Sequence, residues 1–409
     1  MDDVDIAIIG GGLVGASAAL LCARANPNWR IALIDPEPAP AMSAAGRPSF
    51  DSRSSALSAG SADCLQSLGC WSTLADCSGV IDQVHVSDRG YLPGQRLRAS
   101  EFKRSALGYV VPNIALGHAL FKALEQASGV HAVTDQVGQI EFHAGCAQLR
   151  LHSGSTLASK LVVVADGAQS VTRERLGIAT TDYDYAQQAV IANVRVSQKH
   201  NGVAYERFTS EGPLALLPLA DAHELALIWT LPIDQADLAR NWSDAEFLAS
   251  LQRRFGHRLG RFESVSERAS YPLVRREANE QVRSRLVLVG NAAHSLHPVA
   301  GQGFNLALRD CVQLAHHLSR TDPGAFSELL AYQQARDLDQ RLTTAMGDSM
   351  VRLFSRSNPL AVTLRHLGLL GLEVLPALKQ RFGRQMMGLG VNRPVMSVPA
   401  AMNNGGEHG

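Results

Sequence analysis

The residues best suited to chemistry are glycine-rich turns that each follow a buried strand. GGGLVG at 10–15 satisfies G-x-G-x-x-G after the apolar run Ile6–Ile9, and Asp35 ends a second apolar run about twenty residues later. Gly10 would make the turn, Gly12 would let a pyrophosphate reach the backbone, and Gly15 would let helix and strand approach. A helix N-terminus would face the phosphates. The pattern predicts a dinucleotide site, and a carboxylate at 35 disfavours NADP there.

Two further strand ends share this design. Leu161–Val164 is a continuous apolar run that leads into Asp166-Gly167, and Leu286–Val289 leads into a turn of small residues. Gly301 and Gly303 then remove side chains where a helix begins, which leaves unpaired N–H groups at its positive end. Because parallel strands end at one edge of a doubly wound sheet, we expect one flat, electron-rich cofactor to span all three.

The elements that must position these turns are segments with helical patterns and segments with strand patterns. A helix is expected from 51 to 68, with Arg53 in its first turn placed to meet a phosphate, and another from 114 to 126. The runs 189–196, 203–208, 214–218 and 224–230 predict an antiparallel sheet, followed by a helix over 241–255. That sheet interrupts the nucleotide-binding part and is expected to cover the substrate. Helices are expected at 304–318 and 323–354, and a docked amphipathic pair, or a face for membrane or a partner, at 359–387.

Composition, cysteine spacing and hydropathy argue against several classes of protein. The 409 residues are 46% apolar and carry 38 basic and 38 acidic side chains, so no basic excess points to nucleic acid. Six cysteines show neither C-x-x-C nor a metal-ligand spacing, which predicts reduced thiols in a cytoplasmic protein and no metal site. The N-terminus does not resemble a signal peptide, and no window reaches about eighteen uncharged apolar residues.

Taken together, the motifs resemble the three fingerprints of the FAD-dependent aromatic hydroxylases, the para-hydroxybenzoate hydroxylase class, over nearly the whole chain. Within that class the chain is similar to the ubiquinone-biosynthesis hydroxylases, in DSRSSALS at 51–58, ERFT at 206–209, GPLALLPL at 212–219 and HPVAGQGFNLALRD at 297–310. The resemblance implies an α/β fold: a Rossmann-like FAD-binding domain interrupted by an antiparallel β-sheet substrate domain, with C-terminal helices.

The resemblance also implies a division of the chain. FAD-binding parts are expected at 1–80, 108–182 and 276–356, a substrate-domain strand and loop at 81–107, the substrate-binding sheet at 183–275, a helical region at 357–400 and a disordered tail at 401–409.

The activity implied is that of an FAD-dependent NAD(P)H:O2 monooxygenase that hydroxylates a polyprenylated phenol of the 2-octaprenyl-6-methoxyphenol type in ubiquinone biosynthesis. Such a substrate would come from the membrane surface or a carrier, so contact with the inner face of the membrane, or with a complex of biosynthetic proteins, is expected. Two alternatives stay open: a ubiquinone-pathway hydroxylase of different regiospecificity, and a non-catalytic prenyl-binding protein of related fold.

The residues implied to bind cofactor are Gly10, Gly12, Leu13, Val14, Gly15, Asp35, Arg53, Asn113, Val137, Asp166, Gly167, Asn291, Pro298, Gly301, Gln302, Gly303, Phe304 and Asn305. Arg53 would lie on the flavin side and Val137 near the adenine. Asn291 departs from the family pattern, which has Asp there. For catalysis the resemblance points to Gly301 and Gln302, and the candidates for a phenol base are His297, His294 and Tyr271.

Overall fold

The computed structural model describes residues 3–37, 53–88, 94–209, 211–296, 301–318, 322–354 and 376–390. One part of it is built on an eight-stranded sheet in the order β18-β19-β11-β1-β2-β8, which β10 and β9 extend from β11. The strands are β1 (Val4–Ile9), β2 (Ile31–Asp35), β8 (Val130–Thr134), β9 (Val137–Phe142), β10 (Ala147–Leu151), β11 (Thr156–Val164), β18 (Val282–Arg283) and β19 (Leu286–Leu288).

The middle of this sheet is parallel. β1 pairs in parallel with β11 and β2, β11 pairs in parallel with β19, and β2 with β8. The strand ends at Ile9, Val164 and Leu288 therefore lie at the same edge, as the sequence predicted. The apolar runs of β1, β2, β11 and β19 are almost wholly buried because helices cover this part of the sheet, whereas β8 at its edge is largely exposed.

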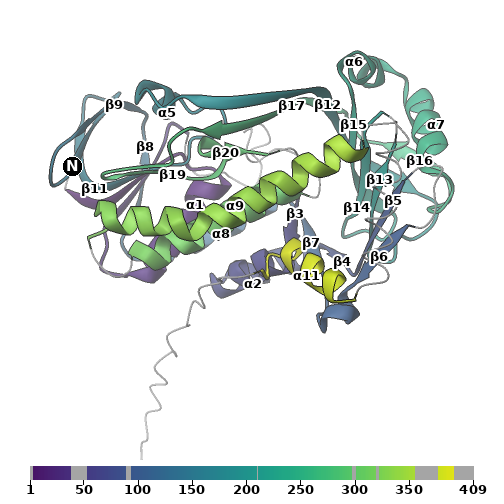
Figure 1. Ribbon diagram of the computed structural model, residues 1–409, viewed down its shortest axis with the longest axis horizontal. Helices are drawn as coiled ribbons and strands as arrows, with labels where there is room; N and C mark the ends of the chain where they lie inside the picture. Colours follow the sequence, from purple (N-terminus) through teal and green to yellow (C-terminus); the bar gives the residue numbers. More distant parts are fainter. Residues whose placement is uncertain are drawn as a thin grey trace, which may run out of the picture.

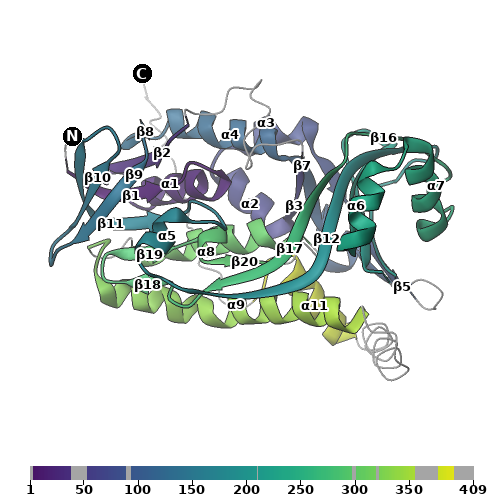
Figure 2. The same cartoon turned by 90° about the horizontal axis from the view of Figure 1, so that it is seen from above.

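Helices pack against this sheet and against one another (Figure 2). α1 (Leu13–Ala25) contacts both α4 (Asn113–Glu125) and α8 (Gln302–Leu318), and α8 in turn contacts the long helix α9 (Phe326–Phe354). Small residues make α1 narrow enough to approach the sheet: Ala16, Ala18 and Ala19 are each buried. A short helix, α5 (Val171–Arg175), follows β11, and the Ser170 side chain caps it as expected.

A second, nine-stranded sheet runs in the order β20-β17-β12-β15-β14-β13-β5-β6, with β16 beside β12. Its strands are β5 (Gln83–Asp88), β6 (Gln95–Arg98), β12 (Thr180–Val196), β13 (Val203–Phe208), β14 (Pro213–Pro218), β15 (Glu224–Pro232), β16 (Phe262–Val265), β17 (Ala269–Ala278) and β20 (His294–Ser295). All pairs are antiparallel except β13 with β5. Figure 1 shows β12 and β17 running along the molecule from the first sheet to the second. Helices α6 (Ile233–Asn241) and α7 (Asp244–Phe255) pack against its outer face.

The expected helix over 51–68 is wrong in its first half. Ser54–Ser58 forms strand β3, which pairs with β7 (Gly108–Pro112), and β7 also pairs with β4 (Gly79–Ile81). Within the described part of this span, 53–68, the helix is α2 (Ala59–Ser67), and the Ser58 hydroxyl accepts the Ser61 N–H that a capping residue should accept. Pairing with a distant strand satisfies the backbone of 54–58 and overrides its local preference.

Several other elements were not predicted from the sequence or have different bounds from the predicted ones. Helix α6 was not predicted, and α8 begins two residues earlier than the pattern suggested. Of the expected pair over 359–387, the structure describes α11 (Pro376–Met386), while 355–375 lie outside the described residues. Short elements are α3 (Trp71–Leu74), η1 (Ala75–Cys77), η2 (Ala99–Phe102) and η3 (Gly290–Ala292). The six thiols are free, and none of the described helices has the length and apolar character needed to span a bilayer.

Candidate active site

The three glycine-containing strand ends touch one another at the edge of the eight-stranded sheet. A Cβ atom on Gly10 would lie 2.6 Å from the Ala165 carbonyl oxygen, and one on Gly290 would lie 2.9 Å from a Val14 methyl. Segments more than a hundred residues apart thus pack with backbone against backbone or against a small side chain. The edge forms one continuous surface on which a single extended ligand can contact all three.

The N-terminus of α1 opens onto this surface. Gly12 precedes the helix and provides no side-chain cap, so the first N–H groups of α1 keep their donor capacity for a ligand. Gly15 lies in the first turn, where a Cβ atom would sit 1.9 Å from the Gly10 carbonyl oxygen. No other residue fits there without moving the loop. The arrangement is an anion cradle of the kind that binds a pyrophosphate.

Asp35 holds the glycine loop in place. One carboxylate oxygen accepts the Gly11 N–H at 2.5 Å, and the other accepts the Glu37 N–H at 3.0 Å. Asp35 therefore has a positioning role in the loop in addition to the cofactor contact that the sequence predicts.

Val137 is buried near the same edge, just beyond β8, and its carbonyl accepts a hydrogen bond from Arg175 at 2.8 Å.

Asp166 carries a buried acceptor with no partner among the described residues. Its Oδ2 accepts the Thr172 N–H at 3.1 Å, whereas its Oδ1 is buried and receives no hydrogen bond there. Gly167 follows, and the space beside its Cα is open. A buried carboxylate oxygen without a donor is costly, so this site suits a ligand hydroxyl or N–H.

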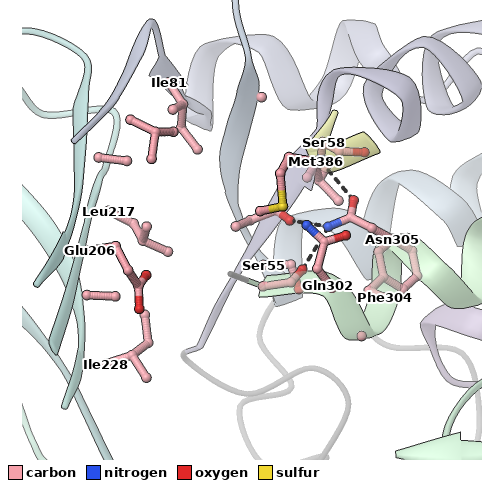
Figure 3. Close-up of a pocket in the computed structure, with 18 of the residues that line it drawn as sticks. Ser55, Ser58, Ile81, Glu206, Leu217, Ile228, Gln302, Phe304, Asn305 and Met386 are labelled. Atoms are coloured by element: carbon pink, nitrogen blue, oxygen red, sulfur yellow. Dashed lines mark hydrogen bonds between the residues drawn. The ribbon is translucent and has the colours of Figure 1, made fainter. Parts of the chain in front are cut away.

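A cavity of about 430 Å³ lies between this edge and the second sheet (Figure 3). One wall comes from β3, η3 and the start of α8, the opposite wall from the second sheet, and α11 lies at one end. Among the sequence-predicted residues it brings together Arg53, Asn113, Asn291, Gly301, Gln302, Gly303, Phe304 and Asn305. The remaining described ones lie outside its lining, most of them at the sheet edge described above.

Asn305 fixes the loop that begins α8. Its amide nitrogen donates to the carbonyls of Ala56 and Gly301, both at 2.7 Å, and its oxygen accepts the Ser58 N–H at 2.8 Å. Gly301 has φ +58°, and a Cβ atom there would lie 2.9 Å from that of Ala56. The amide is saturated by backbone, so Asn305 positions the cofactor-side wall.

Arg53 and Asn113 are joined through the start of β3. The Asn113 N–H donates to the Arg53 carbonyl at 2.8 Å, and the Asn113 oxygen accepts the Ser55 hydroxyl at 2.7 Å. The Arg53 guanidinium lies 4.6 Å from the centre of the Tyr271 ring. Tyr271 itself does not line the cavity. His297 and Pro298 lie outside the described residues.

His294 belongs to a buried ionic cluster. Its Nε2 lies 2.8 Å from an oxygen of Asp310, and Arg336 donates to the other oxygen at 2.6 Å. Burial alone would raise the Asp310 pKa, but the charge of Arg336 and the hydrogen bonds from His294 and Arg336 lower it to about 2. Asp339 bridges Arg336 and Arg309. The cluster links the segment after β19 to α8 and α9. His294 therefore has a structural role.

Glu206 is the lining residue that sequence reasoning missed. It lies on β13, is 8% exposed, and burial raises its pKa to about 7. Among the described residues that line the cavity, it is the one carboxylate. In the structure Ala204, Glu206 and Phe208 are buried in alternation with partly exposed residues, so Glu206 lies on the buried face of β13, which the sequence VAYERF does not indicate by any apolar/polar alternation.

Comparisons with known proteins agree with this geometry. A family model described as an FAD binding domain matches residues 3–341. The ubiquinone hydroxylase UbiL of Rhodospirillum rubrum is 35% identical over 94% of this chain and 89% of its own, and the 3-demethoxyubiquinol 3-hydroxylase of Escherichia coli is 32% identical over 94% and 98%. The crystal structure of p-nitrophenol 4-monooxygenase PnpA from Pseudomonas putida matches with a TM-score of 0.76 at 17% identity, covering 96% of this chain and 100% of that one.

Proposed function

We propose that this chain, which belongs to the FAD-binding family of aromatic monooxygenases that includes the ubiquinone hydroxylases, hydroxylates a polyprenylated phenol of the 2-octaprenyl-6-methoxyphenol type. NAD(P)H and O2 are the co-substrates of this class. The chain is an FAD-dependent aromatic monooxygenase of the ubiquinone pathway, and the proposal concerns which phenol it takes. The observation that carries the proposal is the cavity, which joins a polar wall to apolar ones.

The residues at the sheet edge fit FAD. The open N-terminus of α1 suits its pyrophosphate, Asp35 its adenosine ribose, and the unpartnered Asp166 oxygen a hydroxyl or N–H donor. In this arrangement Arg53 and the start of α8 would hold the flavin end. When bound there, FAD would supply the two-electron redox chemistry with NAD(P)H and the activation of O2. The chain's part is to bind and orient both reactants and to keep water out.

The cavity suits a phenol that carries a hydrocarbon tail. Its cofactor side offers serine, asparagine and glutamine side chains, while the end near α11 is apolar. The apolar side chains at that end are Ile81, Leu97, Phe102, Leu107, Phe382, Met386 and Met387. We place the phenol ring between the polar wall and the second sheet and direct the tail toward α11. Each buried CH2 of the tail contributes about 0.8 kcal/mol, so an apolar exit is needed.

We further propose that the protein works on the inner face of the membrane, or within a complex of biosynthetic proteins, because such a substrate partitions strongly into lipid. Gentle lysis followed by sedimentation tests this. Recovery of the protein in the membrane fraction, released by salt or mild detergent, supports it. Recovery entirely as a free monomer contradicts it.

The decisive experiment is turnover by the purified protein. A yellow preparation is mixed with NAD(P)H and prenyl phenols that differ in ring substitution, and oxygen uptake and product mass are followed. We expect substrate-dependent oxygen uptake and a product with one added oxygen, whose ring position is then assigned by NMR. A product hydroxylated at another position would indicate the related pathway hydroxylase, and a colourless protein that binds the phenol unchanged would indicate a prenyl carrier.

A further inference from the structure

One cross-strand row of the second sheet that lines the cavity is aliphatic except for a single residue. Across the sheet, Glu206 pairs with Val86 on β5 and with Ala215 on β14, and Ala215 pairs with Ile228 on β15. All four residues line the cavity, since cross-strand partners share a face. Ala204, two residues earlier on β13, lines it too. A single carboxylate therefore stands in a row of aliphatic side chains.

That carboxylate has no partner within the described part of the chain. It forms no hydrogen bond or ion pair there, and the residue is only 8% exposed. The neighbouring Arg207 turns to the other side of β13, where it donates to the Arg254 carbonyl at 3.0 Å. Figure 3 shows Glu206 on the wall opposite Ser55, Gln302 and Asn305. A buried, unpaired carboxylate facing a cavity calls for a proton donor from outside the chain.

We propose that Glu206 is the residue that accepts the proton of the substrate's phenol hydroxyl. This inference rests on the proposed function, because only a phenol bound in this cavity brings such a proton. The phenol O–H bond breaks as a carboxyl O–H bond forms on Glu206. The electron pair left on the phenol oxygen moves into the ring, which strengthens attack by the ring carbon on the activated oxygen. The ring carbon then loses its own proton, and the aromatic ring is restored.

The reaction balances with the co-substrates of the class. NAD(P)H supplies two electrons, one oxygen atom of O2 enters the ring C–H bond as C–OH, and the other leaves as water with one proton taken from solvent. Glu206 is regenerated by returning its proton to the product or to water. A general base of this kind typically contributes 10²–10⁴-fold to the rate.

The electrostatic surroundings suit this role. Burial raises the pKa of Glu206 to about 7, which brings it closer to that of a phenol, ordinarily about 10. The other ionisable residues among the described lining are Arg53, on the opposite wall against Tyr271, and Tyr205, whose ring packs on Phe255. His85, beside Tyr205, contacts Arg258. The rise in the Glu206 pKa comes from burial, and no neighbouring charge contributes to it.

The test compares the flavin-loaded wild type with E206Q and E206D on a short-tailed prenyl phenol. We expect E206Q to lose about 10²-fold in hydroxylation rate with flavin content unchanged. The wild-type kcat/KM should fall tenfold per pH unit below about 7, as Glu206 becomes protonated. E206Q should lack this limb, and E206D should keep it. A ring-fluorinated, more acidic phenol should shrink the ratio between wild type and E206Q.

Two different results would overturn the proposal, and they distinguish failure of the Glu206 role from failure of the proposed function. If the wild type makes product and E206Q matches it within threefold with the same pH limb, Glu206 is not the acceptor while the proposed function stands. If the flavin-loaded wild type hydroxylates no prenyl phenol, the proposed function fails, and the role of Glu206 fails with it.

Discussion

Replacing Glu206 by glutamine should make the folded protein more stable at alkaline pH. Burial raises the pKa of this carboxyl from 4.5 to about 7. The folded state therefore favours the protonated form, and its contribution to stability is full below about pH 4.5 and is lost as the pH rises through about 7. Glutamine has nearly the same shape and cannot ionise. E206Q and wild type should accordingly be alike in acid and diverge in base.

The size of the divergence follows from the shift. A difference of about 2.5 pKa units, at ~1.36 kcal/mol each, gives about 3 kcal/mol once the pH is well above 7. At an unfolding entropy of roughly 2.1 cal/mol/K per residue, the 409-residue chain should show a gain of about 4 °C in unfolding temperature at pH 8. Near pH 4.5 the gain should be below about 1 °C.

The assay is thermal unfolding of flavin-loaded wild type and E206Q from pH 4.5 to 8.5, with the difference between the two plotted against pH. E263Q serves as the control, since Glu263 is an exposed glutamate on β16 of the same sheet. Its difference from wild type should not change with pH. A flat difference for E206Q would refute the argument, because it would mean that the carboxylate is solvated or paired when the protein is folded.

Three other substitutions test the rest of the site. N291D, which restores the acid of the wider family beside the proposed flavin end, should keep flavin content but lower the two-electron reduction potential by about 20 mV, as ~1 kcal/mol for an exposed charge implies; an unchanged potential would place Asn291 away from the flavin. D310N removes one of the two carboxylates that pair with the buried Arg336 guanidinium, with Asp339 as the partner that remains, and should cost about 1–3 kcal/mol in denaturant unfolding, whereas no measurable loss would mean that the Asp310–Arg336 pair is solvated. G15A puts a Cβ atom 1.9 Å from the Gly10 carbonyl oxygen and should reduce bound flavin severalfold, measured by absorbance; full flavin occupancy would show that the loop can shift.

The cofactor edge could be predicted from sequence because its signals are local. Each strand-turn pattern is complete within about ten residues, and the parallel arrangement follows from the rule that ligands bind at the carboxyl ends of such strands. The structure brings Gly10, Asp166 and Gly290 to one edge accordingly. Even Ser170 was identifiable as a cap from its position before an expected helix.

The substrate side could not be predicted in the same way, because its features depend on partners distant in sequence. Ser54–Ser58 becomes a strand through β7, some fifty residues away. Tyr271 was a candidate base by type, yet it lies behind Arg53 and outside the cavity lining. Glu206 faces the cavity because of the register of three strands, which no local pattern fixes.

Two buried carboxylates in this fold show how structure separates a stabilising acid from a reactive one. Asp310 is fully buried, yet Arg336 and His294 hold its pKa at about 2, so it stays charged far below neutral pH. Glu206 is buried to nearly the same degree, but no described residue supports its charge, and its pKa rises to about 7. An acid whose only role was packing would be replaced by glutamine or leucine with a gain in stability. The cost of keeping Glu206 makes sense if its carboxylate is used to exchange a proton, and we propose that this exchange takes place in the cavity that Glu206 lines.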